Sequence, residues 1–255
     1  MTRRLTILLA ALPLLFFTTC APGEKESVPA PATPSGPPDA VTADPNHYKV
    51  EFENDVVRVL RVKYAAGSKS VMHSHPAYCG VGLTDTRFKI TMATGEVESG
   101  NSVTPPGRVG CVDAQTHLPE NLGGDAEGIY VELKNRKTFD NGQGVKPSAP
   151  ATPPDAVTAD PKHYTVKFEN DTVRVLEASY PPGAKAPMHA HPANCTVELT
   201  AGKVREKQAS GEVTTSDVKL GEAGCGDGLA HQPENIGDKT FRTLIFELKN
   251  RRTFK

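Results

Sequence analysis

The chain has 255 residues, with 29 Lys and Arg against 30 Asp and Glu, 8 His, 5 Cys and no Trp. This length suits one large domain or two small ones, each long enough to build a core. A net charge of -1 excludes nucleic-acid binding through a basic surface. The 22 Gly and 22 Pro favour short strands and turns over long helices.

Residues 1–20 have the pattern of an export signal. A short basic segment precedes an apolar run of 13 residues that ends at Phe17, and such a run is too short to span a bilayer comfortably. Cys20 follows closely, which resembles the lipobox of bacterial lipoproteins, where the Cys is acylated and becomes the mature N-terminus. Thr19 departs from the small residue preferred there, so ordinary cleavage and soluble secretion form the alternative.

The remainder of the chain contains two copies of one unit. From Asp39 and Asp155 onward, 27 of the first 41 aligned positions are identical, which indicates a tandem duplication. Polar, Pro-rich stretches that cannot build a core precede and separate the copies. The expected organisation is a signal peptide and lipobox (1–20), a tether (21–41), a first domain (42–139), a linker (140–157) and a second domain (158–255).

Within each copy the pattern indicates an all-β protein. β-branched and polar residues alternate over 56–62, as in a half-buried strand, and the pair Thr94-Gly95 has the composition of a hairpin tip. No segment of ten or more residues has the periodicity of an amphipathic helix. Many short strands at regular spacing predict a sandwich, a jelly roll or a barrel.

All eight histidines fall at matching positions, four in each copy. His47 and His163 stand beside a Tyr, and we expect them to be structural or exposed. The other six form two candidate metal-binding sets, which are His73, His75 and His117, and His189, His191 and His231. Residues two apart on a strand point to the same face, so each His-x-His pair presents two imidazoles together. Three histidines with open positions suit an exchangeable or catalytic divalent transition metal, namely Fe, Mn, Zn, Cu or Ni.

The spacing around these histidines resembles the two motifs of the cupin superfamily, G-x5-H-x-H and H-x3-N. Gly67 and Gly183 each stand six residues before a His-x-His pair, and Asn121 and Asn235 each stand four residues after a third histidine. The resemblance implies a bicupin, with two double-stranded β-helix (cupin jelly-roll) barrels in tandem and one metal held by three histidines in each. Both asparagines are then candidates to hydrogen-bond the ligand imidazoles.

The motif departs from the family pattern at its fourth ligand. Cupins normally supply a Glu shortly after the second histidine. Those positions hold Tyr78, Cys79 and Gly80 in the first copy and Asn194, Cys195 and Thr196 in the second. The missing carboxylate argues against activities like those of oxalate-degrading bicupins and quercetin dioxygenases. It leaves the three-His variant found in thiol, gentisate and diketone dioxygenases.

The resemblance also predicts how the cysteines pair. In the cupin fold the His-x-His strand runs antiparallel beside the strand that leads to the third histidine, and opposed residues have a constant sum of positions. When the first and third histidines of a copy are opposed, its two cysteines are opposed as well. The expected disulfide bonds are Cys79–Cys111 and Cys195–Cys225, on the inward face with the ligands. In the alternative, Cys79 or Cys195 replaces the Glu as a thiolate ligand of zinc or copper.

Disulfide bonds imply an oxidising compartment. Together with the signal they predict export to the cell envelope or periplasm, with a lipid anchor at Cys20 as the only membrane attachment. Two functions stay open: a protein that binds a transition metal, or a small ligand through it, and a metal-dependent three-His oxygenase or related enzyme. Tyr78, Gln115 and Tyr130 are candidate acid, base or anchor residues, but the second copy repeats none of them, which favours binding. The sequence leaves the small molecule and the oligomeric state open.

Overall fold

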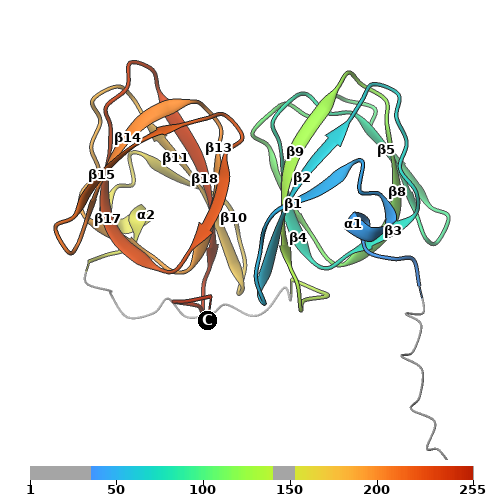
Figure 1. The fold of residues 1–255 in the computed structure, drawn as a ribbon, viewed down its shortest axis with the longest axis horizontal. Coiled ribbons are helices and arrows are strands. Elements are labelled where there is room, and N and C mark those ends of the chain that lie inside the picture. Colours follow the sequence, from blue (N-terminus) through green and yellow to red (C-terminus); the bar gives the residue numbers. More distant parts are fainter. Residues whose placement is uncertain (1–35, 140–152, 255) are drawn as a thin grey trace, which may run out of the picture. The chain divides into compact units, whose positions relative to one another are not determined.

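The computed structural model describes residues 36–139 and 153–254. The expected signal, Cys20 and most of the tether therefore lie outside the described residues, as does most of the linker. In the described part the chain forms two repeats, coloured blue to green and yellow to red in Figure 1. The elements of repeat 1 are α1 (Ala40–Ala43), β1 (Tyr48–Glu53), β2 (Val57–Tyr64), β3 (His73–His75), β4 (Tyr78–Gly82), β5 (Phe88–Met92), β6 (Val97–Ser99), β7 (Val109–Val112), β8 (Gln115–Asn121) and β9 (Ala126–Leu133). Those of repeat 2 are α2 (Ala156–Ala159), β10 (Tyr164–Glu169), β11 (Val173–Tyr180), β12 (His189–His191), β13 (Asn194–Glu198), β14 (Gly202–Gln208), β15 (Val213–Val218), β16 (Ala223–Gly226), β17 (Leu229–Asn235) and β18 (Phe241–Leu248).

Each repeat consists of two antiparallel sheets that curve around an interior (Figure 1). The five-stranded sheets have the orders β1-β2-β9-β4-β7 and β10-β11-β18-β13-β16. The four-stranded sheets have the orders β3-β8-β5-β6 and β12-β17-β14-β15. The topology is therefore the same in both repeats, and the expectation of an all-β fold with two tandem barrels is confirmed.

Short local signals place the turns between these strands. The side chain of Asn54 accepts hydrogen bonds from the backbone N–H groups of Val56 and Val57 at 2.8 and 2.9 Å, which closes the β1–β2 hairpin. Asn170 closes the β10–β11 hairpin in the same way. Gly95, at the tip of the β5–β6 hairpin, has a φ of 88° that other residues rarely adopt.

The two faces of the five-stranded sheets carry different cores. One face of each contributes to a hydrophobic cluster that contains residues of both repeats, including Val57, Val131, Val175 and Phe246. The opposite face belongs to the interior of its own barrel, where repeat 1 has a separate cluster that includes Tyr48, Leu60, Val62, Tyr64 and Ala126. The histidine sets lie in these interiors, beside the tyrosines.

The structure contains the disulfide bonds Cys79–Cys111 and Cys195–Cys225. In each repeat, the numbers of opposed residues add up to the same sum on the histidine strand pair and on the cysteine strand pair. In repeat 1, β3 pairs with β8 so that the first and third histidines are opposed, and β4 pairs with β7 so that the cysteines are opposed. These two pairs nevertheless belong to different sheets. The disulfide bonds fit an oxidising, extracytoplasmic compartment.

The expectation that the cysteines share the inward face with the histidines is wrong. Cys79 and Cys195 belong to the cluster that the two repeats share, whereas the neighbouring Tyr78 contacts His75 inside the barrel. The even number of residues between His73 and Cys79 does not place them on one face, because β3 and β4 lie in different sheets. Side chains alternate only within a strand, so the alternation starts anew at β4. Neither cysteine is therefore a thiolate ligand of the histidine groups.

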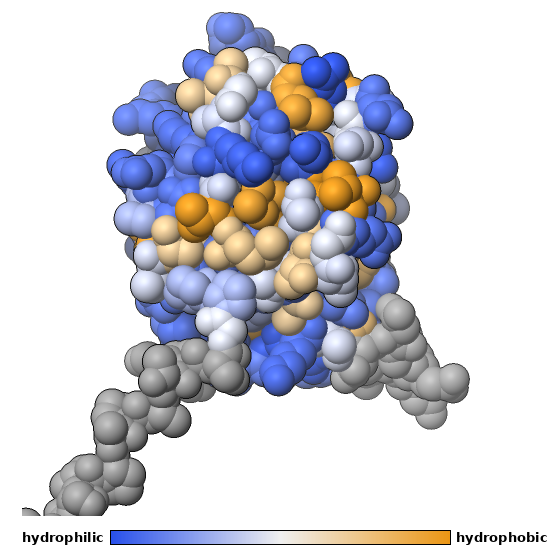
Figure 2. Space-filling view, turned by 90° about the vertical axis from the view of Figure 1, so that its right-hand side faces the viewer, coloured by the Kyte–Doolittle hydropathy of each residue, from blue (hydrophilic) through white to orange (hydrophobic). Residues whose placement is uncertain are grey.

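Hydrophobic side chains also reach the surface. Figure 2 views the side of the molecule on which β5 and β8 lie, and hydrophobic residues form a band across the middle of this face. Folded proteins routinely expose apolar area, so the band alone does not indicate a partner. The described part of the chain contains no helix with the length and apolarity that a membrane span requires.

Candidate metal centres

The structure brings the three histidines of each repeat together. The first two lie on β3 or β12, and the third lies on β8 or β17, the neighbouring strand. Within each group the candidate ligand atoms all lie within 4.8 Å of one another. The repeat 1 side chains are at most 3% exposed. In repeat 2, His189 and His191 are 0% and 6% exposed, and the side chain of His231 is 12% exposed.

Hydrogen bonds fix the orientation of the first two imidazoles in repeat 1. His73 donates from Nδ1 to the carbonyl oxygen of Val71 at 2.7 Å. His75 donates from Nδ1 to a carboxylate oxygen of the buried Glu132 at 2.6 Å. Because both Nδ1 atoms carry the proton, the two Nε2 atoms are left to face each other, at 3.0 Å.

This convergence of imidazole nitrogens fits a cation. Burial, and then the neighbouring His75, lowers the pKa of His73 to about 4, so at neutral pH its Nε2 is a lone pair. Burial together with His75 and His73 lowers the pKa of His117 to about 3, and neither of its ring nitrogens has a hydrogen-bond partner among the described residues. Buried polar atoms without partners are costly. A divalent transition metal would satisfy all three, and imidazole nitrogens are ligands that such metals favour.

Repeat 2 repeats this arrangement with two additions. His189 donates from Nδ1 to the Pro187 carbonyl at 2.8 Å, and its Nε2 lies 3.1 Å from Nε2 of His191. Burial lowers the pKa of His189 to about 4. The first addition is the hydroxyl of Tyr164, 2.9 Å from Nε2 of His189. The second is the carboxylate of Glu206, 3.2 Å from Nδ1 of His231. Within the described part of the chain, Nε2 of His231 has no hydrogen-bond partner.

A buried carboxylate supports one histidine in each repeat. Glu132 and Glu247, which are 0% and 1% exposed, bond His75 and His191 at 2.6 Å. Each also accepts from an arginine, Arg58 or Arg174, at 2.6 and 2.5 Å. Such a partner fixes the ring and makes the ligand nitrogen more basic. This duplicated Glu was not predicted from the sequence, although its place between two apolar residues near the end of each final strand was a detectable signal.

Asn121 and Asn235 have a different role from the one expected. The amide of Asn121 donates to the backbone carbonyls of Ala65 and Gly124 at 3.0 and 2.7 Å, and Asn235 binds backbone groups in the same way. Neither bonds an imidazole, so they stabilise the chain around the end of β8 and β17. His47 and His163 lie outside both groups and bond the nearby Asp44 and Asp160.

Repeat 1 contains a cavity of about 240 Å³ whose lining includes two tyrosines that contact His75 but none of the three histidines. Its lining includes the rings of Tyr78 and Tyr130, which stack at 4.6 Å and both contact His75. Gln115 donates a hydrogen bond to the Tyr78 hydroxyl at 2.7 Å. Gly80 leaves room for this pair, since a Cβ there would lie 2.9 Å from the Tyr130 ring. The three sequence candidates therefore lie close together: Tyr78 and Tyr130 belong to the cavity lining, and Gln115 is hydrogen-bonded to Tyr78.

Repeat 2 has different side chains at the equivalent positions. Gly80 and Tyr130 are opposed on β4 and β9, and the residues opposed at the same place on β13 and β18 are Thr196 and Ile245. Glu198 replaces Gly82 at the end of the strand. Burial raises the pKa of Glu198 to about 8, with Glu222 and Glu206 acting in the same direction. At these positions repeat 2 therefore does not carry the residues that line the aromatic cavity of repeat 1.

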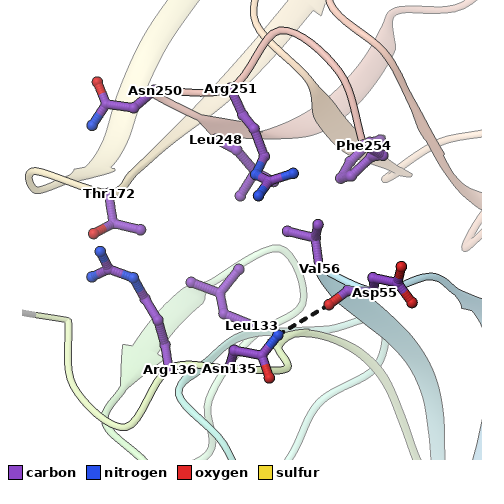
Figure 3. A pocket seen from close by; sticks show the side chains of 10 residues that line it. All are labelled: Asp55, Val56, Leu133, Asn135, Arg136, Thr172, Leu248, Asn250, Arg251 and Phe254. Atoms are coloured by element: carbon purple, nitrogen blue, oxygen red, sulfur yellow. Dashed lines mark hydrogen bonds between the residues drawn. The ribbon is translucent and has the colours of Figure 1, made fainter.

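A larger pocket of about 580 Å³ contains none of the candidate ligands. Figure 3 shows that it is lined by matching segments of both repeats, with Leu133 and Arg136 from one and Leu248 and Arg251 from the other. Its side chains include no His or Cys. The candidate metal centres are therefore elsewhere, inside the barrels.

The fold and the two buried three-His groups define a tandem cupin-like protein with two candidate metal sites. No family model matches the sequence, and no curated protein matches it. The chain is similar to oxalate decarboxylase from Bacillus subtilis, a solved structure, at 14% identity and a TM-score of 0.51, over 78% of this chain and 69% of that one. A second structure of that enzyme, studied for its Mn(II) centres, gives 14% identity and a TM-score of 0.51, over 77% and 70%.

A further similarity concerns a single repeat. A cupin domain from Bordetella pertussis Tohama I is 28% identical, with a TM-score of 0.32, over 34% of this chain and 91% of that one. At 14% identity the likeness to the two-domain enzyme establishes the cupin fold alone. The chemistry of this chain has to be argued from its own residues.

Proposed function

We propose that this chain is an exported bicupin that binds one divalent transition metal in each repeat, in a binding role. The observation that carries the proposal is the convergence of three buried imidazoles in each repeat, with the Nδ1 atoms of the first two held by fixed acceptors. The metal would satisfy buried nitrogens that no described group satisfies. Three protein ligands leave open positions, which suits an exchangeable metal.

The protein residues prepare each centre before the metal arrives. Val71 and Glu132 hold the first two rings of repeat 1 in the tautomer that directs Nε2 inward. Burial keeps His73 and His117 neutral, so no proton has to be removed from them at neutral pH. Bound metal would act as a Lewis acid for an exchangeable ligand.

Repeat 1 is the repeat that we propose binds a small molecule. Its cavity of about 240 Å³ is below the range of about 300–1,000 Å³ typical for drug-sized ligands. Tyr64, Tyr78 and Tyr130 contribute to the wall, and tyrosines combine apolar area with a hydrogen-bonding hydroxyl. A compact ligand with a flat apolar part fits this lining.

The specific observation that favours an enzyme, the second candidate, is the bonded pair of Gln115 and Tyr78 beside His75. This pair could position a substrate at a three-His oxygenase centre. Burial raises the pKa of Tyr78 far above its ordinary value, however, so it stays a neutral phenol and no phenolate is available to take a proton. This supports the binding role over the catalytic one.

The location is part of the proposal. We propose that the exported protein is held in the cell envelope, in the periplasm, by a lipid at Cys20. The supporting observations are the apolar run and cysteine of the sequence and the two disulfide bonds. Mass spectrometry of the intact protein from its native host would show a mature N-terminus at Cys20 with added acyl chains. An unmodified N-terminus would favour soluble secretion.

Elemental analysis of the purified full chain tests the metal-binding role. We expect two equivalents of transition metal in the wild type and one in each of the variants His73→Ala and His189→Ala. Lys69→Gln is a matched control, because Lys69 lies on the same segment with its side chain 54% exposed. Metal content that does not fall in either histidine variant would contradict the proposal.

A further inference from the structure

The third histidine is held differently in the two repeats. At Nδ1 the first two have the same partners in both repeats, a backbone carbonyl and a buried Glu. In repeat 2, Nδ1 of His231 lies 3.2 Å from a carboxylate oxygen of Glu206. In repeat 1, no group in the described ranges 36–139 and 153–254 hydrogen-bonds either ring nitrogen of His117. The two centres therefore differ in the Nδ1 partner of one ligand, the third histidine.

The difference originates in a single substitution between the copies. Glu206 lies on β14 opposite Pro233, whereas the same position on β5, opposite Pro119, is Ile90. Repeat 2 thus carries a carboxylate where repeat 1 carries an aliphatic side chain. The side chain of Glu206 is 39% exposed, and one of its carboxylate oxygens faces the imidazole.

A carboxylate that accepts a hydrogen bond from Nδ1 fixes the tautomer and orientation of the imidazole. The carboxylate accepts a hydrogen bond from Nδ1, which leaves Nε2 of His231 as the atom available to a metal, and no group among the described residues hydrogen-bonds that atom. Such a partner also increases the basicity of the ligand nitrogen. For His117 the described residues offer no partner that selects one tautomer, so metal binding has to order its ring.

We infer that Glu206 is a positioning residue for His231, and that the second centre consequently holds its metal more tightly than the first. This inference rests on the proposed metal binding. Glu206 is not a member of the group whose ligand atoms lie within 4.8 Å, so it acts through His231. Losing a partner of this kind typically lowers metal affinity 10–100-fold.

Tyr164 acts in the opposite direction, but weakly. Its hydroxyl occupies Nε2 of His189 at 2.9 Å, and a metal would displace it. Tyr180 offers it another partner, since the two rings are 5.9 Å apart at 83°. The equivalent rings in repeat 1, Tyr48 and Tyr64, are 6.0 Å apart at 85° and bond through their hydroxyls at 2.8 Å. One neutral hydrogen bond is exchanged for another, whereas Glu206 contributes a charge.

The test isolates each centre in the full chain with disulfide bonds intact. His117→Ala removes the first centre, and His231→Ala removes the second. Each is titrated with Co²⁺, whose visible absorption reports occupancy and coordination, in competition with a chelator. Glu206→Gln is then added to both backgrounds. Glu234→Gln is the matched control, because Glu234 lies on the same sheet and pairs only with the exposed Arg205 and Lys185 among the described residues.

We expect the His117→Ala chain to bind Co²⁺ more tightly than the His231→Ala chain. Glu206→Gln should weaken the former about 10–100-fold, shift its spectrum, and leave the latter unchanged. A purely structural role for Glu206 would instead lower the thermal stability of the metal-free protein without changing affinity. Equal affinity with and without Glu206→Gln overturns the inference alone, provided that Co²⁺ binds. A wild type that takes up no Co²⁺ overturns the proposed function as well.

If His117→Ala fails to fold, judged by circular dichroism, His73→Ala silences the first centre in its place. The comparison is then repeated with Glu206→Gln in that background. A spectrum that changes to a different coordination number with Glu206→Gln would assign Glu206 as a direct ligand, which also overturns the positioning role.

Discussion

Replacing Glu132 by Ala should destabilise repeat 1, because the buried charge of Arg58 then loses its partner. Glu132 is fully buried and bonds both His75 and Arg58 at 2.6 Å. The side chain of Arg58 is 14% exposed, and its other partner, Asp39, has a side chain that is 44% exposed. Removing one member of a buried pair typically costs about 3–5 kcal/mol, because the remaining charge is uncompensated.

This cost is large enough to measure by urea unfolding or calorimetry of the metal-free protein. If the repeats unfold together, as their shared core suggests, the unfolding midpoint should fall by about 6–20 °C. The compensated variant Arg58→Met with Glu132→Gln should recover most of the loss, because the charge is gone and an amide oxygen still faces His75. Glu53→Gln, which breaks only an exposed pair with Lys134, should cost less than about 1 kcal/mol. A cost for Glu132→Ala as small as that of this control would refute the reasoning.

Three further predictions concern the cysteines, Glu198 and the cavity. Denatured, unreduced protein should show no free thiols in the two repeats by thiol titration, and four would contradict the disulfide bonds; closing loops of 32 and 30 residues stabilises by about 3–4 kcal/mol each. The pKa of Glu198 is raised to about 8, so between its ordinary value and pH 8 the unfolded chain loses a proton that the folded chain keeps, and stability falls as pH rises. Glu198→Gln should flatten this slope in urea unfolding at pH 5–8, and an unchanged slope would argue against the shift. Gly80→Thr should lower the free energy of unfolding by about 1–3 kcal/mol, because the new side chain overpacks against Tyr130. Adding Tyr130→Ile, which recreates the residue pair of repeat 2, should restore stability. Calorimetry that shows no recovery would contradict the packing account.

The sequence predicted the strand content, the repeat and the histidine groups because each depends on local pattern. His73 and His75 share a face over two residues, a distance too short for the alternation to drift. The constant sum that aligned His73 with His117 also aligned Cys79 with Cys111. Register is a property of paired strands, so it could be read from the numbering.

The face on which the cysteines lie could not be read in this way. The chain leaves one sheet after β3 and enters another at β4, and only the three-dimensional path shows that the alternation restarts. The role of Asn121 was missed for a related reason: the motif places it near His117 in the chain, but its amide turns to Ala65 and Gly124. Glu206 carried no signal, because its partner on β17 is 25 residues away.

Native mass spectrometry of the full chain tests the metal-binding account most directly, because it counts ions on intact molecules. After incubation with a divalent transition metal and removal of the excess, the wild type should carry two ions. The double variant His73→Ala, His189→Ala should carry none, and its disulfide bonds should remain intact. A wild type without bound metal, or a double variant that still carries two ions, would contradict the account.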